Sequence, residues 1–124
     1  MIFCSAEKRG IGMKIREVAE KLGYEAVAMP CPDKEVTGGY TGDLLSWVMV
    51  RAREGNIWIT IMTNSNIVAV ASLSGVSAIV IAEGLPVSRD IAELADEKNV
   101  NILKSKKSVF ETSIELGNAI GIFS

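Results

Sequence analysis

The chain has 124 residues, of which 48% are hydrophobic and 23% charged, which suits one globular domain with a filled core and is too short for two. Its 13 Lys and Arg against 15 Asp and Glu leave no cationic excess for nucleic-acid phosphates. No apolar run approaches the roughly 20 residues that span a bilayer, and residues 1–12 lack the apolar stretch and cleavage site of a secretory signal. We therefore expect a soluble, cytoplasmic protein with neither nucleic acid nor a membrane as partner.

The beginning of the chain separates into two parts. Residues 1–12 have no clear hydrophobic period, so we expect an N-terminal extension at 1–12 and a single α/β domain over 13–124. From Met13 onward, apolar residues recur at helical spacing. Gly23 follows them where a left-handed helix cap is expected.

The rest of the chain alternates between short apolar runs and amphipathic stretches. Strands are predicted over 24–29, 56–63, 77–82 and 101–103. Helices are predicted over 43–55, 65–75, 89–99 and 108–122. Ser88 fits the N-cap of the third of these helices, and Gly117 and Gly121 are expected to fray the last one. The alternation predicts a largely parallel sheet of about four to five short strands covered by helices, because the strands are apolar throughout.

Catalytic and metal-binding side chains are scarce. The chain has no His, which removes the commonest general base and every Ser–His or Cys–His pair. It has two Cys, whereas a structural zinc or an iron–sulfur cluster takes about four ligands. We expect no catalytic residue, no metal and no cofactor, with Cys4 and Cys31 as reduced thiols. Pooling of thiols between two subunits is the alternative.

The segment 36–45 is the most informative one, because three glycines stand within five residues directly before a predicted helix. Glycine permits positive φ and leaves N–H groups unobstructed, and helix N-termini attract anions. The candidate ligand-binding residues are Thr37, Gly38, Gly39, Tyr40, Thr41, Gly42 and Asp43. No Lys-Ser/Thr pair follows the glycines, so the segment is not a P-loop. The competing interpretation is an entry turn in which Thr41 or Asp43 caps the helix.

Thr63 and Asn64 are the second candidate ligand-binding group. They follow a predicted strand, and ligands of parallel sheets gather beyond the carboxyl ends of strands. Glu83 and Gly84 end the next strand and could complete a polar rim. The competing interpretation is that Thr63 or Asn64 caps the following helix, and that the segment 83–84 is an ordinary turn.

Three other features have structural interpretations as well as functional ones. Trp47 lies one position off the apolar stripe of its helix, which suits either a protein contact or cover for the sheet edge. Trp58 is expected in the core. The basic residues of 104–107 are expected in a solvated loop.

The stretch 13–122 resembles the DRTGG domain family. The resemblance rests on V-T-G-G-Y-T-G-D-L-L-S-W-V-M, on W-I-T-I-M-T-N-S-N-I-V-A-V-A and on A-I-V-I-A-E-G. Of the motif that names the family, Thr37, Gly38 and Gly39 match, whereas Glu35 and Val36 stand where its Asp and Arg would be.

The resemblance implies an α/β domain similar to the N-terminal domain of HPr kinase. Such domains are regulatory or spacer modules fused to CBS-containing pyrophosphatases and to phosphotransacetylases, and the family association points to dimers. Stand-alone forms with this G-G-Y-x-G-D-L-L-S wording resemble proteins labelled hydrogenase-related or iron–sulfur-binding in anaerobic bacteria.

Together these features predict a non-catalytic regulatory or accessory domain that acts as a homodimer. Its expected ligand is a small anionic or nucleotide-like molecule at the glycine-rich helix N-terminus. The alternative is an accessory protein of an iron hydrogenase or related redox complex, with any metal held only at a subunit interface. An enzyme that handles phosphoryl groups is a third and weaker hypothesis.

Overall fold

Helices and strands alternate along most of the chain in the computed structural model, which describes Cys4 and residues 12–121. The extension predicted at 1–12 therefore lies outside the described residues, apart from Cys4 and Gly12. The elements in chain order are α1 (Ile15–Leu22), β1 (Glu25–Ala28), β2 (Gly38–Thr41), α2 (Leu45–Arg51), β3 (Asn56–Thr60), α3 (Asn66–Ser74), β4 (Ala78–Ile81), α4 (Arg89–Glu97), β5 (Ile102–Lys104) and α5 (Val109–Ala119).

The five strands form one sheet in the order β1-β5-β4-β3-β2. The pairs β2–β3, β3–β4 and β4–β5 are parallel, and β1 is antiparallel to β5 at one edge. The predicted fold class, a largely parallel helix-covered sheet, is confirmed.

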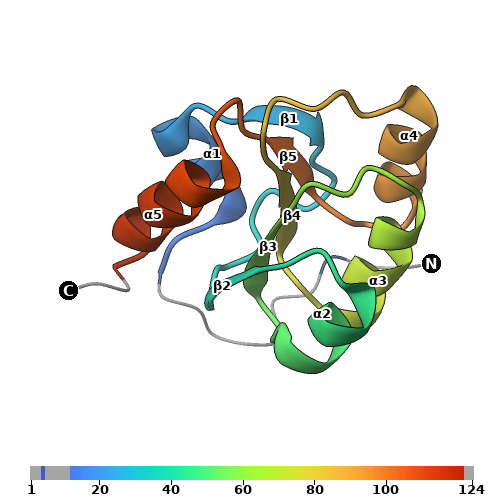
Figure 1. The fold of residues 1–124 in the computed structure, drawn as a ribbon, viewed down its shortest axis with the longest axis horizontal. Helices are drawn as coiled ribbons and strands as arrows, with labels where there is room; N and C mark the ends of the chain where they lie inside the picture. Colours follow the sequence, from blue (N-terminus) through green and yellow to red (C-terminus); the bar gives the residue numbers. More distant parts are fainter. Residues whose placement is uncertain (1–3, 5–11, 122–124) are drawn as a thin grey trace.

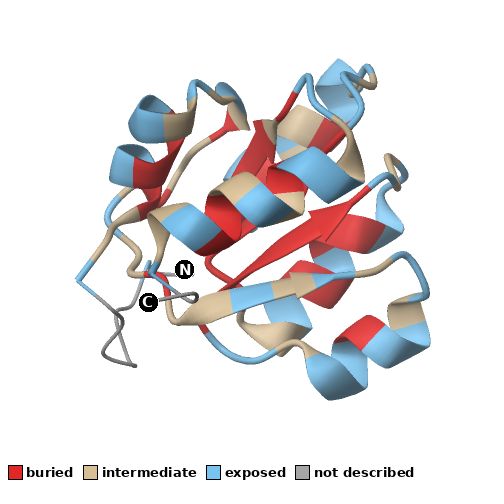
Figure 2. Ribbon diagram, turned by 60° about the vertical axis from the view of Figure 1, so that its left-hand side comes forward, coloured by how far each residue is buried: buried red, intermediate tan, exposed pale blue. Residues whose placement is uncertain are grey.

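Helices cover both faces of this sheet (Figure 1). One hydrophobic cluster lies under α2, α3 and α4, and contains Trp58 and Ile79 among its fully buried side chains. A second cluster lies under α1 and α5, and contains Ile15 and Leu103. Every residue of β3 and β4 is buried, which explains why β4 and the centre of β3 are apolar (Figure 2).

The segment 36–42 was predicted as a turn, and the structure corrects this prediction. Residues Gly38–Thr41 form the edge strand β2, paired in parallel with β3 from Gly38 opposite Asn56 to Thr41 opposite Ile59. Glycine is a poor strand former, so local preference gave no strand signal. Pairing with a strand that begins 18 residues later decides the conformation, and that pairing is invisible to local patterns.

Other boundaries shift for physical reasons. Helix α2 ends at Arg51, short of the predicted Gly55, which instead turns into β3 with a φ of 85°. Helix α5 continues through Gly117, because this glycine is buried against the core. Gly23 has the expected left-handed conformation, and the Ser88 hydroxyl caps α4 by accepting from the Ile91 N–H. None of the helices in the described part of the chain is long and apolar enough to cross a membrane.

A long connection joins the two edges of the sheet. Strand β1 runs against its neighbour, so it ends beside the beginning of β5, and the chain must then reach β2 at the opposite edge. The connection passes the beginnings of β5, β4 and β3 in turn. It is fastened there through the contacts Cys31–Asn101, Glu35–Ser77 and Thr37–Asn56. We call this side the amino end of the sheet, and the side where β2, β3, β4 and β5 finish the carboxyl end.

Candidate functional site

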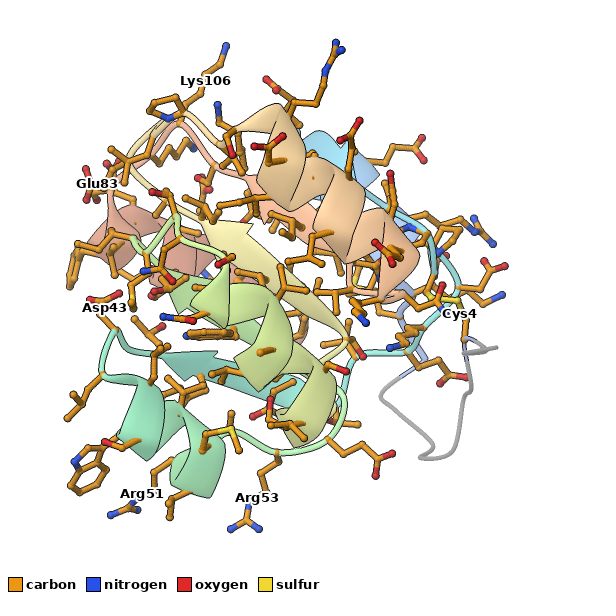
Figure 3. All side chains as sticks on the ribbon, turned by 90° about the vertical axis from the view of Figure 1, so that its right-hand side faces the viewer. Cys4, Asp43, Arg51, Arg53, Glu83 and Lys106 are labelled. Carbon is orange, nitrogen blue, oxygen red and sulfur yellow. A yellow bond between two sulfur atoms is a disulfide. The ribbon has the colours of Figure 1, made fainter. Side chains whose placement is uncertain are left out.

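Four loops meet at the carboxyl end of the sheet. They follow the parallel strands and comprise residues 42–44, 61–65, 82–84 and 105–108. In Figure 3, Asp43, Glu83 and Lys106 lie on the same side of the molecule, away from Cys4. In parallel sheets covered by helices, this is the end at which ligands bind.

Asp43 joins the first two of these loops. Its Oδ1 accepts a hydrogen bond of 2.7 Å from the hydroxyl of Thr60 and one of 3.0 Å from the N–H of Ile61. Trp58 fixes the preceding residue, because its indole N–H donates to the carbonyl of Gly42 at 2.8 Å. Asp43 therefore secures the β2–α2 corner to β3 and does not cap α2, contrary to the competing interpretation.

The main chain at this end offers hydrogen-bond donors. The structure gives no acceptor, within the residues it describes, for the N–H groups of Asp43, Leu44, Leu45 and Ser46. The same holds for the N–H groups of Thr63, Asn64 and Ser65 ahead of α3. These two sets belong to loops that follow neighbouring strands, so both are available at one end of the sheet.

The structure does not bring all nine predicted ligand-binding residues together. Gly42, Asp43, Thr63 and Asn64 lie at the carboxyl end. Thr37 lies beyond the other end of β2, five residues before Gly42 and therefore about 16 Å away along the extended chain. Its hydroxyl donates to the carbonyl of Glu54 at 2.7 Å and accepts from the Asn56 amide at 3.2 Å.

The residues between these two ends form the edge strand itself. Gly38, Gly39, Tyr40 and Thr41 pair with β3, so they do not form the helix-entry loop that was expected. The Thr41 hydroxyl lies 3.0 Å from the hydroxyl of Ser113 on α5, and does not cap α2. Asn64 lies one residue before Ser65, the N-cap of α3, and its Oδ1 accepts from the N–H of Asn66, the first residue of that helix, at 2.9 Å.

Glu83 and the loop after β5 complete the carboxyl end. Glu83 has a φ of 68°, and its Oε2 accepts from the N–H of Val109 at the start of α5, at 3.0 Å. The Gly84 N–H donates to the carbonyl of Ser105 at 2.9 Å, which brings the last two loops together. The Glu115 carboxylate pairs with Lys107 and raises the pKa of that ammonium, whereas Lys106 is exposed.

Lys106 was expected only in a solvated loop. Its position at the carboxyl end follows from β5 being parallel to β4, which makes the segment 105–108 the fourth loop there. The parallel order was part of the predicted fold, so this neighbourhood could have been inferred from the sequence.

Helix α2 presents an apolar outer face. Leu44, Trp47 and Val50 are 60%, 50% and 79% exposed. The guanidinium of Arg51 lies 4.9 Å from the centroid of the Trp47 ring. Trp58 is fully buried, as predicted, and Val36, which stands where the family motif has Arg, is fully buried beneath α1.

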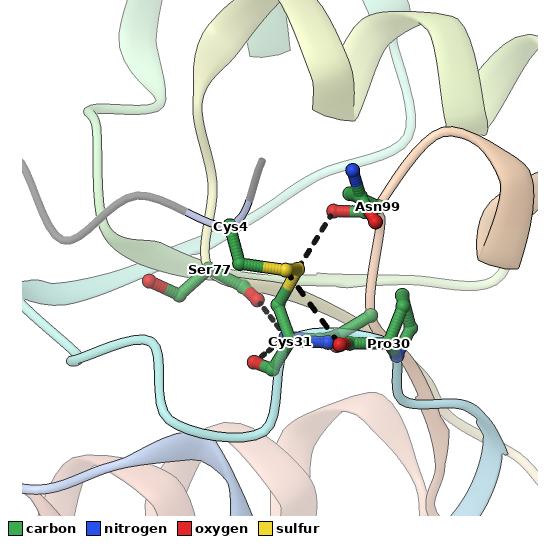
Figure 4. The surroundings of a disulfide bond; sticks show 6 residues. Cys4, Pro30, Cys31, Ser77 and Asn99 are labelled. Carbon is green, nitrogen blue, oxygen red and sulfur yellow. Dashed lines mark hydrogen bonds between the residues drawn. A yellow bond between two sulfur atoms is a disulfide. The ribbon is translucent and has the colours of Figure 1, made fainter. Parts of the chain in front are cut away.

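The two cysteines lie at the amino end of the sheet. The prediction that they are reduced is wrong in this structure, where Cys4 and Cys31 form a disulfide (Figure 4). The sequence separation of 27 residues gave no sign of the contact, which depends on the connection that follows β1. Among the described residues, no group of three or more Cys, Asp or Glu side chains could hold a metal ion.

Comparisons with known proteins agree with this fold. The model of the DRTGG domain matches residues 43–119. No curated protein matches the chain.

One solved structure that matches contains the CBS and DRTGG domains of the regulatory region of Clostridium perfringens pyrophosphatase, complexed with its activator diadenosine tetraphosphate. The TM-score is 0.63 and the identity 21%, over 80% of this chain and 44% of that one. The chain thus spans less than half of that regulatory region, and the likeness is one of fold.

Proposed function

The chain belongs to the DRTGG domain family, and from this premise we propose that it is a non-catalytic, cytoplasmic regulatory or accessory domain. Its proposed ligand is a small anionic, nucleotide-like molecule bound at the carboxyl end of the sheet. The proposed contacts are the main-chain N–H groups of Asp43 and the start of α2 and those of Thr63, Asn64 and Ser65, while Lys106 supplies a positive charge at the same end of the sheet.

The observation that carries this proposal is the pair of N–H sets at residues 43–46 and 63–65, which find no acceptor in residues 12–121 or Cys4. Main-chain N–H groups at helix beginnings are good donors to phosphate oxygens. Two such sets after neighbouring strands could bind two phosphate groups of one ligand. A relative with this fold is complexed with a dinucleoside tetraphosphate as its activator, which is a ligand of this chemistry.

The side chains at this end have structural roles that fit a binding site. One oxygen of the Asp43 carboxylate is engaged by Thr60 and Ile61, and one oxygen of the Glu83 carboxylate by Val109. The commonest general base is a histidine. The chain has no His that could serve in this role.

Replacing Leu45 tests the main-chain donors. Leu45 is the first residue of α2, where proline is tolerated, and the extended conformation of Leu44 (φ −91°, ψ 107°) suits a residue before proline. Leu45→Pro removes one unoccupied N–H, whereas Leu45→Ala loses the same side chain and keeps the N–H.

We expect calorimetric titration with diadenosine tetraphosphate to give an affinity about tenfold weaker for Leu45→Pro than for Leu45→Ala, since a hydrogen bond to a charged group contributes about 1.5–3 kcal/mol. Equal affinities of the two variants would show that the start of α2 does not bind the ligand. If the unaltered chain does not bind diadenosine tetraphosphate, this molecule is not its ligand.

We further propose that the chain forms a homodimer through the apolar outer face of α2. An exposed tryptophan with apolar neighbours is typical of the centre of an interface. Light scattering should then give twice the chain mass, and Val50→Asp should give the monomer mass. A monomer at micromolar concentration without the substitution would contradict the dimer.

The same α2 face favours a second candidate function, as an accessory protein of an iron hydrogenase or related redox complex that docks there. A metal held at a subunit interface does not fit the donors present, because both thiols are joined in the disulfide. If elemental analysis finds iron in anaerobically purified protein, the hypothesis of a metal held at a subunit interface would be supported again.

A further inference from the structure

The disulfide at the amino end of the sheet joins two very different cysteines. Cys4 is exposed, whereas Cys31 is only 2% exposed. From this asymmetry we propose that the pair is a thiol–disulfide exchange site, at which a low-molecular-weight thiol forms a mixed disulfide with Cys4. This site lies at the opposite end of the sheet from the proposed ligand, so it does not depend on the proposed function.

Cys31 is held in place independently of the disulfide. The side-chain oxygen of Asn101 accepts from the N–H of Cys31 at 2.9 Å, and its amide donates to the carbonyls of Cys31 and Ser77 at 2.8 Å. Asn101 is itself only 1% exposed and lies at the start of β5. The main chain of Cys31 therefore keeps its position when the sulfur–sulfur bond opens.

The reduced state also has hydrogen-bond partners ready. The Cys4 sulfur lies 3.6 Å from the carbonyl oxygen of Pro30, and the Cys31 sulfur lies 3.6 Å from that of Asn99 (Figure 4). In the disulfide these are contacts, and after reduction each S–H could donate to its carbonyl. Both oxidation states are therefore accommodated by the same surroundings.

The accessibility of the two sulfur atoms determines which of them the small thiol attacks. The thiolate of the small thiol attacks the Cys4 sulfur, since the Cys31 sulfur is shielded. The Cys4–Cys31 bond breaks, the new bond joins Cys4 to the small thiol, and Cys31 leaves as a thiolate that takes a proton from water. A second thiolate of the small thiol then attacks the small-thiol sulfur of the mixed disulfide. This step releases Cys4 as a thiolate and joins the two small molecules in a symmetric disulfide.

The burial of Cys31 decides which cysteine carries the mixed disulfide. The Cys31 sulfur is shielded from solvent and the Cys4 sulfur is accessible, so the small thiol is joined to Cys4. Persistent disulfides are rare in reducing compartments, where those present are usually transient and redox-sensing, as this one would be.

The test is incubation of the full chain with a glutathione–glutathione disulfide buffer, followed by acid quenching and peptide mass spectrometry without reduction. We expect one glutathione per chain, on the peptide that contains Cys4, and at least a tenfold excess of that adduct over any on Cys31. Cys31→Ser should still take up one glutathione, and Cys4→Ser should take up none while folded.

Three outcomes would overturn the proposal. They are glutathione mainly on Cys31, a Cys4→Ser variant that is modified in its folded state, and two free thiols by titration in a chain prepared under oxidising conditions. Unchanged circular dichroism of both serine variants serves as the control for folding.

Discussion

Asp43 has one oxygen atom that serves two donors, the buried hydroxyl of Thr60 and the N–H of Ile61. Removing the acceptor leaves the Thr60 hydroxyl without its partner. We expect Asp43→Ala to lower the free energy of unfolding by about 1–2 kcal/mol, and Asp43→Asn, which keeps a side-chain oxygen, to lower it by less than half as much. Urea denaturation of the three proteins measures both differences, and equal stability of Asp43→Ala and the unaltered chain would contradict the role.

Tyr24 gives the molecule a specific response to alkaline pH. Its hydroxyl is buried without a hydrogen-bond partner among the described residues, and burial, with the Glu115 carboxylate second, raises its pKa from 10.0 to about 12. In the unfolded chain Tyr24 ionises near pH 10, while in the folded chain it stays neutral to about pH 12. The stability that this tyrosine contributes is thus complete below pH 10 and is lost as the pH rises toward 12.

Tyr24→Phe removes that dependence. Two pH units at about 1.4 kcal/mol each set an upper limit of about 2.8 kcal/mol, and solvent screening of the partly exposed tyrosine lowers the effect below it. We expect the free energy of unfolding of the unaltered chain to fall by up to this amount relative to Tyr24→Phe between pH 10 and 12, as measured by denaturant titration at each pH. Parallel pH profiles of the two proteins would rule out a buried Tyr24 hydroxyl.

At the scale of the element, two serines at helix beginnings differ in what their side chains do. The Ser108 hydroxyl accepts from the N–H of Glu111 at 3.1 Å at the start of α5, whereas Ser65 caps α3 without a side-chain hydrogen bond. We expect Ser108→Ala to cost about 1 kcal/mol of stability and Ser65→Ala a few tenths at most. Thermal unfolding of the two variants compares them, and equal shifts in Tm would refute the assignment.

Elements with a local signal were predictable, and those decided by distant partners were not. The apolar runs of β3 and β4 and the spacing of α1 and α4 carry their structure in neighbouring residues. Strand β2 does not, because its glycines and threonine become a strand only by pairing with β3. Because β2 has no local strand signal, the predicted binding segment 37–43 runs along this strand and reaches both ends of the sheet.

The same reason explains what was predictable in the site. The position of Thr63 and Asn64 at the carboxyl end could be predicted because they directly follow a strong strand signal. The acceptor role of Asp43 could not be found, because it needs the β2–α2 corner to lie beside the end of β3. The disulfide depends on the path of the chain after β1, which no local pattern encodes.

At the scale of the whole molecule, the two ends of the sheet differ in how their main-chain polar groups are used. The amino end is closed by the connection over 29–37, whose polar groups meet Asn101, Ser77 and Asn56. The carboxyl end has main-chain donors on two neighbouring loops for which the described part of the chain supplies no acceptor. We propose that the carboxyl end binds the ligand, while the amino end holds the connection in place and carries the exchange site.

The most direct measurement is a nitrogen-15 correlation spectrum of the full chain, recorded during titration with diadenosine tetraphosphate. Free donors that bind phosphate should show the largest shifts, so we predict them at the amides of residues 43–46 and 63–65, with the amides of Cys31, Ser77 and Asn101 unmoved. Saturable shifts confined to the amino end, or no shift at millimolar ligand, would contradict the account.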